Sequence, residues 1–293
     1  MSISHNILSP AKVNLFLRVL RKRDDGYHDI VSLMQHISLY DEIVLDVGEG
    51  NGIFMECDEK NIPLDNTNLA FRAAEAFLDR TGLKRRVCIK MKKRIPVGAG
   101  LGGGSSNAAS VLMGLNEITA SGLSGDELMK IGAGLGSDVP FFILRGSAIA
   151  SGRGERLEGI KIHRFWYVLI NPGFQVSTAW AYKNLNLTKN IEDINITISK
   201  VLPLFSADGL RDSHALKGFL INDLEDVTIK RYPEINGLKN ALTDRGAFAA
   251  LMSGSGPTVF GIFDEERARK AFEQIKKQPQ FKKMSVFVAQ GIG

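Results

Sequence analysis

Apolar and polar residues alternate near the start of the chain, and this period of two predicts a β-strand over residues 12–19. A turn is expected at residues 24–26, where two aspartates precede a glycine. Apolar-rich stretches predict further strands at 43–47 and 87–91. The first half of the chain is therefore expected to contain a β-sheet.

Helical spacing is found between these strands. Apolar residues of segment 68–80 recur on one helical face, so a helix is predicted there, capped by Asn66 or Thr67 and ended by Gly82. The sequence Ser124-Gly-Asp-Glu127 has the spacing of a capping box and predicts the start of a second, shorter helix.

The second half of the chain has the pattern order strand, helix, two strands, helix and strand. This is the split βαβ order of ferredoxin-like domains. The segments are 166–170, 234–244, 248–252, 258–263, 265–277 and 285–289. A polar, glycine-bearing stretch at 151–155 is the expected boundary between two α+β domains, which would comprise residues 1–155 and 156–293.

Composition narrows the class of protein. Apolar residues make up 44% and charged residues 24% of the 293 residues, which is typical of a soluble globular protein. The 37 basic and 32 acidic residues leave a net charge of +5. The densest basic run, 90–94, flanks a predicted strand, as an ordinary solvated face would. No nucleic-acid partner is expected, because such proteins gather basic residues on one element.

The small number of cysteines and the lack of a signal-peptide pattern in residues 1–6 predict a cytoplasmic location. Cys57 and Cys88 form no Cys-x-x-Cys pair, and two thiols do not make a disulfide framework. No apolar run reaches the ~18 residues that span a bilayer, and residues 1–6 do not resemble a signal peptide. The histidines show no metal-ligand spacing, so no protein-built metal site is expected. The expected assembly is a monomer or a weak homodimer.

Residues 96–106 form the most informative segment. Its glycines allow backbone N–H groups to approach a ligand closely. The helix expected from about Ser105 would direct the positive end of its dipole to the same place, so the segment predicts an anion site, and phosphate is the usual anion. A plain strand-to-helix connector is the alternative, but it would need only one or two glycines.

Other known site types match this segment less well. Residues 98–103 fit the dinucleotide fingerprint, but no acidic residue ends a second strand about 20 residues later. The Gly-Lys-Ser/Thr of a Walker loop and the His-Arg-Asp and Asp-Phe-Gly elements of protein kinases are missing. Neither Ser105 nor Ser255 lies in a Gly-x-Ser-x-Gly elbow. The pair Ser105-Ser106 instead suits hydroxyls on phosphate or on Mg²⁺.

Three motifs resemble those of the GHMP kinases, the superfamily of galactokinase, homoserine kinase and mevalonate kinase. Segment 96–106, followed by Asn-Ala-Ala, resembles the central motif, while 10–15 resembles the first and 251–259 the third. The resemblance implies a two-domain α+β architecture: an N-terminal ribosomal-protein-S5-domain-2-like domain and a C-terminal ferredoxin-like domain with a cleft between them. It also implies a small-molecule kinase that uses ATP, with Mg²⁺ carried by the nucleotide.

The resemblance implies which residues hold ATP. Asn68 matches a position that reaches the nucleotide, although a helix start is an equally good interpretation. The other implied ATP-binding residues are Pro96, Val97, Gly98, Ala99, Gly100, Leu101, Gly102, Gly103, Gly104, Ser105 and Ser106.

Asp138 and Lys12 are the candidate catalytic residues. Phosphoryl transfer to a hydroxyl needs alignment, charge neutralisation and a group that accepts a proton. Asp138 alone would be interpreted as a helix cap, and Lys12 alone as a strand lysine that faces water. The resemblance implies instead that Asp138 is the base at the acceptor hydroxyl. Lys12 would keep Asp138 ionised and offset charge on the transferring group.

Further features resemble one branch of the superfamily, whose acceptor is a cytidine diphosphate polyol. They are the third consecutive glycine of 102–104 and the segments 23–28 and 136–142. Two functions of other classes stay open. A nucleotide-binding regulator would have kept the loop and lost the chemistry, and a nucleic-acid module would use the ferredoxin-like half, although the aromatic stacking motif of such sheets is missing.

The same resemblance implies the substrate-binding residues. Cytosine is planar and carries hydrogen-bonding groups on one edge, so an aromatic ring and a polar side chain would recognise it. Tyr27 and Tyr182 are implied to stack on the base with His28 at its edge. A packed core aromatic and a structural histidine are the alternatives. Thr178 lies one helical turn before Tyr182, and Asn14 is implied to contact the polyol or to orient the catalytic lysine.

Overall fold

The computed structural model describes residues 2–187 and 220–293. The chain forms two compact units, each assembled from segments that lie far apart in the sequence. Unit 1 consists of Met1–Ala11, Leu39–Ile95 and Gly102–Arg145, and unit 2 consists of Lys12–Ser38, Pro96–Leu101 and Gly146–Gly293. The single boundary expected between residues 155 and 156 divides the chain differently, and it stays a prediction.

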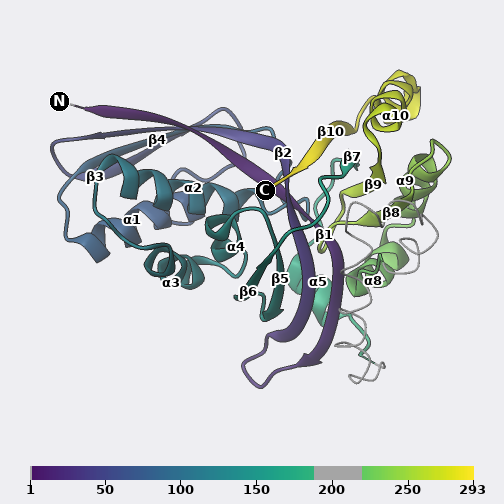
Figure 1. Cartoon of the computed structure of the whole chain (residues 1–293), viewed down its shortest axis with the longest axis horizontal. Helices are drawn as coiled ribbons and strands as arrows, with labels where there is room; N and C mark the ends of the chain where they lie inside the picture. Colours follow the sequence, from purple (N-terminus) through teal and green to yellow (C-terminus); the bar gives the residue numbers. More distant parts are fainter. Residues whose placement is uncertain (1, 188–219) are drawn as a thin grey trace. The chain divides into compact units, whose positions relative to one another are not determined.

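A β-sheet forms one side of unit 1 (Figure 1). Strand β4 (Arg86–Lys92) pairs antiparallel with β2 (His28–Gly48) and parallel with β3 (Gly52–Cys57). Strand β1 (Ile3–Lys22) pairs with β2 and contributes its first residues to this unit. Both strands predicted from apolar-rich stretches are confirmed, as parts of β2 and β4.

The helices of unit 1 lie along this sheet (Figure 1). They are α1 (Leu69–Thr81), α2 (Gly103–Ile118), α3 (Gly125–Leu135) and α4 (Val139–Leu144). Helix α2 approaches the sheet closely at Gly114, where a Cβ atom would lie 2.4 Å from the Ile7 side chain and 2.7 Å from that of Leu45. Such close packing holds helix and sheet in a single core.

Local capping sets the ends of α1 and α3. Asn68 caps α1, because its Oδ1 accepts a hydrogen bond at 2.8 Å from the backbone N–H two residues later. The predicted cap at Asn66 or Thr67 was therefore wrong by one or two residues. Gly82 ends α1 in the left-handed region at φ 68°, as predicted. Helix α3 begins with the predicted capping box.

Among the described residues, unit 2 contains a four-stranded antiparallel sheet in the order β10, β7, β9, β8. The strands are β7 (Trp166–Asn171), β8 (Ala249–Met252), β9 (Val259–Phe263) and β10 (Ser285–Ile292). In chain order, the first strand pairs with the last and the third, and the second lies at an edge. This is the predicted split βαβ arrangement.

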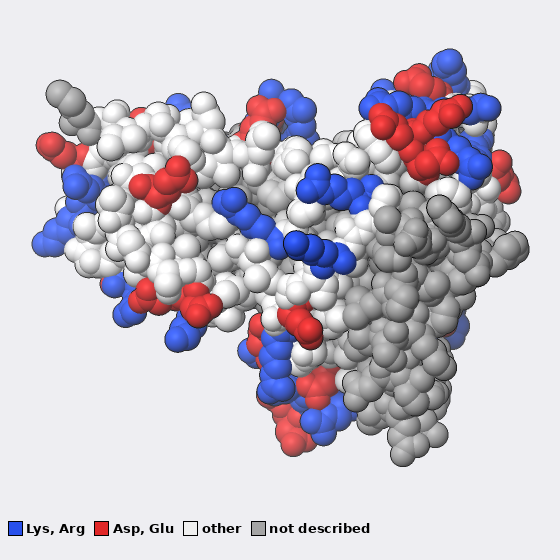
Figure 2. Space-filling view, viewed as in Figure 1, with Lys and Arg blue, Asp and Glu red and all other residues white. Residues whose placement is uncertain are grey.

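The described helices of unit 2 are α5 (Thr178–Lys183), α8 (Asp223–Arg231), α9 (Glu234–Thr243), α10 (Glu265–Lys277) and the 3₁₀ turn η4 (Pro279–Phe281). Helix α10 turns Ala268, Ala271 and Ile275 into the core. Its outer surface mixes acidic and basic side chains (Figure 2), which is typical of a solvated helix. No helix in the described ranges is both long and apolar enough to cross a membrane.

A hairpin and a strand pair complete unit 2. Strands β1 and β2 are joined at the predicted turn, where Gly26 has φ 83° and the Arg23 N–H donates to Tyr27 O at 2.8 Å. Strand β5 (Ser147–Gly152) pairs with the first half of β2, and β6 (Arg156–Ile160) pairs with β5. The polar stretch at 151–155 includes the turn between β5 and β6, within unit 2.

Candidate active site

The glycine-rich loop follows a backbone path that glycine adopts far more easily than other residues. Gly98, Gly100 and Gly102 have φ values of 63°, 75° and 71°, all in the left-handed region. The residues Pro96–Leu101 belong to unit 2, and α2 begins in unit 1 at Gly103, two residues earlier than expected. The backbone conformation therefore favours glycine at these three positions, whereas a plain connector was expected to need only one or two glycines.

In unit 2, parts of all three sequence motifs are in direct contact. Ser253 Oγ donates a hydrogen bond to Gly100 O at 2.9 Å and accepts one from the Asn14 N–H at 3.3 Å. The Lys12 N–H donates to Leu101 O at 3.0 Å. A Cβ atom on Gly100 would lie only 2.0 Å from Ser253 O, so the contact between the second and third motifs requires glycine.

Lys12 is oriented by its neighbour on the same face of β1. The residue is buried, only 4% exposed, and its Nζ donates to Asn14 Oδ1 at 2.5 Å. Asn14 Nδ2 in turn donates to Ser32 Oγ at 2.8 Å, and Ser32 Oγ donates to Phe16 O at 2.7 Å. This is the contact expected if Asn14 orients the lysine. Lys12 therefore does not face water, as an ordinary strand lysine would.

Sequence reasoning missed two residues that hold the third motif. Asn222 Nδ2 donates to Met252 O at 2.8 Å and to Gly254 O at 2.6 Å, while its Oδ1 caps α8. Glu225 accepts the Met252 N–H at 2.7 Å and pairs with Lys239. An asparagine before an acidic first turn could have been recognised as a helix cap. Its bonds to a loop 30 residues later have no local signal.

In unit 1, Asp138 occupies the N-cap position of α4. Its carboxylate makes no capping hydrogen bond there, so the interpretation of Asp138 as a simple helix cap is not supported. Gly136, two residues earlier, lies close to α2: a Cβ on it would be 3.9 Å from Ser105 Oγ. The first turn of α2 and the turn that carries Asp138 are therefore neighbours within unit 1.

The two serines of the loop differ in their surroundings. Ser106 is fully buried, and its Oγ lies 2.7 Å from Ser9 Oγ in a hydroxyl pair. Ser105 is partly exposed, with its Oγ on the Gly136 side. Ser105 is therefore the less buried of the two serines, while Ser106 has a buried hydroxyl partner. Asn68 uses both ends of its amide at the start of α1, since its Nδ2 also donates to Pro63 O at 2.8 Å.

The residues implied to bind cytosine gather in unit 2. The rings of His28 and Tyr182 are stacked, with centroids 5.0 Å apart and planes 26° apart. Tyr27 is 54% exposed, and the Arg153 guanidinium lies over its ring at 5.0 Å. Thr178 shares a hydroxyl pair at 2.8 Å with Ser255 of the third motif. The ring stacked on Tyr182 is thus that of His28, whereas the sequence implied a cytosine between Tyr27 and Tyr182.

Charges around the β1–β2 turn hold this region in shape. The Arg23 and Arg21 guanidinium groups bond to Asp29 and hold the pKa of its carboxyl below the usual value. Arg23 also pairs with Asp25. Burial, followed by the nearby charge of Lys22, lowers the pKa of His28 below its usual value of 6.5. The imidazole of His28 is therefore neutral at pH 7 and able both to donate and to accept a hydrogen bond.

Two family models match regions of the chain that contain the second and third motifs. The model of the GHMP kinases N terminal domain matches residues 68–146, and that of the GHMP kinases C terminal domain matches residues 206–280. A relative from Syntrophotalea carbinolica, named 4-diphosphocytidyl-2-C-methyl-D-erythritol kinase, is 48% identical over 283 residues, which cover 96% of this chain and 98% of the relative. This chain belongs to the GHMP kinase family.

Solved structures agree with this membership. The crystal structure of a 4-(cytidine 5'-diphospho)-2C-methyl-D-erythritol kinase is 32% identical, with a TM-score of 0.81 over 99% of this chain and 100% of that one. A homoserine kinase from Cytophaga hutchinsonii, 18% identical with a TM-score of 0.77 over 99% of this chain and 94% of that one, shares the fold. The predictions of a GHMP kinase fold, a small-molecule kinase and ATP as phosphoryl donor are confirmed at the level of the family.

Proposed function

We propose that this GHMP kinase transfers the γ-phosphoryl group of ATP to the 2-hydroxyl of 4-diphosphocytidyl-2-C-methyl-D-erythritol. The products would be ADP and the 2-phosphate, in the non-mevalonate route to isoprenoid precursors. The observation that carries the proposal is the 48% identity, over nearly the whole chain, to a relative named for this activity. The contacts among the three motifs in unit 2 support it, because they shape a backbone loop suited to phosphate.

The proposed reaction needs a base and a charge partner. Asp138 would accept the proton of the attacking hydroxyl as its oxygen bonds to the γ-phosphorus, while the bond from phosphorus to the β-γ bridging oxygen breaks and ADP leaves. Lys12 would stabilise negative charge on the transferring phosphoryl oxygens and keep Asp138 ionised. The role of Asp138 is supported by the position of its turn beside the first turn of α2. The role of Lys12 is supported by Asn14, which orients its ammonium group.

Mg²⁺ fits this proposal as an ion carried by the nucleotide. Within residues 2–187 and 220–293, no group of three or more His, Cys, Asp or Glu side chains could hold a metal ion on its own. Magnesium prefers oxygen ligands and keeps several from phosphates and water. The partly exposed Ser105 hydroxyl and the Asp138 carboxylate are the protein groups that would hold it. The ion would neutralise charge on the phosphate oxygens.

The cytidine end would be bound by the aromatic residues of unit 2. A base that stacks on Tyr182 would have to displace His28 from that ring, and the neutral His28 imidazole would then be available at the edge of the base. Tyr27, with Arg153 over its ring, would provide the second aromatic surface. Thr178 and Asn14 complete the proposed substrate-binding set. A monomeric or weakly dimeric state and a cytoplasmic location stay predictions.

Turnover tests the proposal directly. Purified protein would be supplied with Mg-ATP and 4-diphosphocytidyl-2-C-methyl-D-erythritol, and ADP release would be followed with phosphorus NMR of the product. We expect ADP and a new phosphate monoester in equal amounts. Homoserine and mevalonate serve as alternative acceptors. Turnover of either one, without turnover of the cytidine substrate, would reject the proposed acceptor while leaving the kinase assignment in place.

A further inference from the structure

We propose that Asp41 is a positioning residue for the nucleotide site, because its buried carboxylate ties together the segments that precede and follow the glycine-rich loop. The proposal rests on the proposed function only in taking this loop as the ATP site. Asp41 lies on β2 in unit 1. Unit 1 also contains residues 93–95, which precede the glycine-rich segment, and residues 103–107, where that segment continues into α2. No sequence motif pointed to it.

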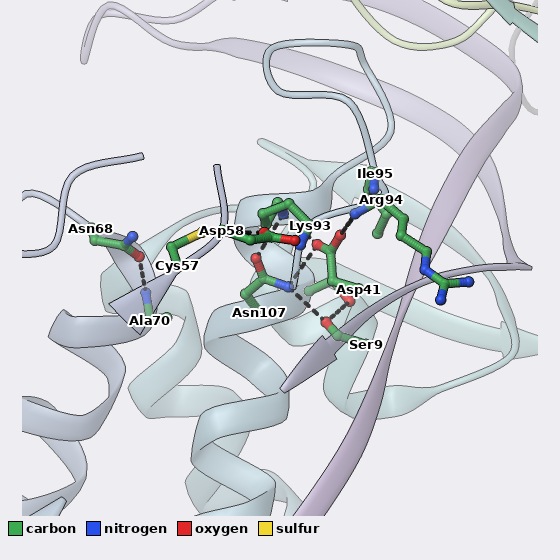
Figure 3. Close-up of polar contacts among 11 residues, drawn as sticks. Ser9, Asp41, Cys57, Asp58, Asn68, Ala70, Lys93, Arg94, Ile95 and Asn107 are labelled. Atoms are coloured by element: carbon green, nitrogen blue, oxygen red, sulfur yellow. Dashed lines mark hydrogen bonds and ion pairs between the residues drawn. The ribbon is translucent and has the colours of Figure 1, made fainter. Parts of the chain in front are cut away.

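The Asp41 carboxylate receives hydrogen bonds from both flanks (Figure 3). Oδ1 accepts the backbone N–H groups of Arg94 at 2.8 Å and Ile95 at 2.9 Å. Oδ2 accepts Lys93 Nζ and Asn107 Nδ2, the latter at 2.9 Å. Ile95 is the last residue before the loop, and Asn107 lies in the first turns of α2. The Asp41 side chain thus bonds both to residues just before the loop and to a residue of the helix that follows it.

A second layer of bonds extends this network along α2. Asn107 Oδ1 accepts Lys93 Nζ at 2.9 Å, and Asn107 Nδ2 also donates to Ser9 Oγ at 3.0 Å. Ser9 then reaches Ser106 through the hydroxyl pair described above. Figure 3 shows Asp41 at the centre of this group, with Ser9 from β1 on one side and Lys93 on the other. The first turn of α2 is therefore fixed by partners on β1, on β2 and just after β4.

The two flanks also touch directly. A Cβ atom on Gly103 would lie 3.0 Å from the Ile95 side chain and 3.4 Å from Lys93 Nζ. This close approach explains a glycine at position 103, where the helix geometry by itself does not require one. The flanks are therefore held together both by packing and by the Asp41 carboxylate.

Removing the charges of this ion pair from water costs free energy. A gain in stability therefore does not by itself explain why the pair is buried. Asp41 is 0% exposed and the Lys93 side chain is 7% exposed. A buried pair is often replaceable by apolar residues without loss of stability. A carboxylate with four donors from two segments, however, fixes their relative positions, which apolar contacts would leave looser. Fixed loop ends limit the conformations of the intervening backbone, so its N–H groups are ready for phosphate before ATP binds.

The substitution Asp41→Asn tests the proposal. It keeps the shape of the side chain and the acceptor for the two backbone N–H groups, but it places an NH₂ group against the Lys93 and Asn107 donors. We expect the dissociation constant of ADP and the KM of ATP to rise about tenfold or more, since unmade buried hydrogen bonds are costly. The KM of the acceptor should stay within about threefold of wild type, because its proposed residues lie elsewhere.

A second substitution should rescue the first. In the double variant Asp41→Asn, Asn107→Asp, the carboxylate moves to position 107, where Lys93 already donates to the Oδ1. The amide introduced at position 41 would keep accepting from the backbone and would donate to the new carboxylate. ADP affinity should return to within about threefold of wild type. The single change Asn107→Asp, which puts two carboxylates side by side, should weaken ADP binding at least as much as Asp41→Asn.

Controls separate positioning from general stability. Asp46→Asn on the same strand removes a surface ion pair to Arg86 at 3.1 Å, and ADP affinity should not change. ADP binding is measured by calorimetry at a temperature where melting curves show each variant folded. Wild-type ADP affinity in folded Asp41→Asn protein, or no recovery in a folded double variant, would overturn the inference. Absence of ADP binding by the wild type would instead reject the ATP site itself.

Discussion

The glycine-rich loop and the turn between β1 and β2 are both proposed to bind nucleotide groups, but they are built in different ways. Around the loop, the interacting groups are backbone atoms and fully buried side chains such as Asp41 and Ser106. Around the turn, they are partly exposed rings and ion pairs, including Tyr27 under Arg153 and Arg23 with Asp29. The first arrangement is buried and has little room to adjust, whereas the second consists of side chains that are partly exposed to solvent.

This difference predicts two kinds of response to substitution. Changes at the loop should act through the backbone, so they should lower both nucleotide affinity and stability. Changes at the turn should alter recognition of the cytidine group alone, in graded steps, because each ring or charge contributes separately. One substitution outside both regions gives a reference, and three further tests address this contrast, in order of decreasing expected effect.

Asp138→Asn is the reference variant with the largest expected effect. Asp138 lies outside both regions, and the substitution would remove the proposed base while keeping the shape of the side chain. We expect kcat to fall roughly 10²- to 10⁴-fold, the usual contribution of a positioned base, while the affinity for ADP measured without Mg²⁺ stays unchanged. Steady-state kinetics and ADP calorimetry measure the two quantities. A kcat near that of the wild type would reject Asp138 as the base and leave positioning and electrostatics as the source of catalysis.

Gly100→Ala tests the rigidity of the loop. The new methyl group would meet Ser253 O at 2.0 Å on a residue with φ 75°, so strain and overlap should together cost about 3 kcal/mol or more. We expect a lower melting temperature and a loss of ADP affinity. Gly82→Ala is the matched control: its φ is 68°, but nothing lies within 4 Å of the added atom. It should cost only about 1–2 kcal/mol of stability and leave ADP binding intact.

Should the two glycine variants prove equally stable and bind ADP equally well, the contact between the second and third motifs would not matter for the loop. The comparison depends on the difference between the variants. Both residues have left-handed backbone angles, so that component of the cost is shared and cancels.

Tyr182→Ala tests the turn region. Stacking of a base on an aromatic ring contributes about 1–3 kcal/mol, so the KM of the cytidine substrate should rise roughly 5- to 150-fold. ADP affinity should not change. Tyr182→Phe keeps the ring and should bind much more tightly than the alanine variant. Competition with CDP measures the cytidine group separately from the polyol. An equal loss of CDP and ADP affinity would contradict the separation of the two regions.

The smallest expected effect is a pH dependence at His28. Its pKa is lowered from 6.5 by burial and by Lys22, so the folded protein binds fewer protons than the unfolded chain between the lowered pKa and pH 6.5. The stabilising contribution of neutral His28 is complete above pH 6.5 and falls as the pH drops through that window. CDP affinity should follow the same direction, remaining constant until the pH is below 6.5.

Lys22→Gln should move this acid limb of CDP binding to a slightly higher pH, because the neighbouring positive charge is removed. High salt should act in the same direction by screening that charge. An acid limb that is unchanged in a His28→Asn variant would show that another group is responsible.

Much of the fold could be predicted because its signals are local. The strand at 12–19, the capping box at Ser124 and the ferredoxin-like order of the second half all follow from periodicity and caps. The errors were local too. The cap of α1 is Asn68, since neighbouring residues of similar capping ability compete for one position. Helix α2 starts at Gly103 although glycine is a poor helix former. A Cβ atom there would lie only 3.0 Å from the Ile95 side chain, a contact that the local sequence does not reveal.

The candidate site could be predicted only where it coincided with a motif. Lys12, Asp138 and the loop were found in this way, and their catalytic roles stay predictions. Asn222 and Asp41 were not found, because an isolated asparagine or aspartate has many ordinary uses. Their partners lie 30 and 66 residues further along the chain, at Met252 and Asn107. No periodic pattern links residues at such distances.

The sequence by itself determined the resemblance to GHMP kinases, because the segment from Pro96 to Ser106 and its companion motifs are local patterns. That this segment binds phosphate stays a proposal. The tertiary structure decided how that loop is held. It buried Ser106 against Ser9, left Ser105 partly exposed and placed Asp41 across the two flanks. The physical reason is that conformational preference acts on adjacent residues, whereas burial and hydrogen-bond pairing depend on which distant residues folding brings together.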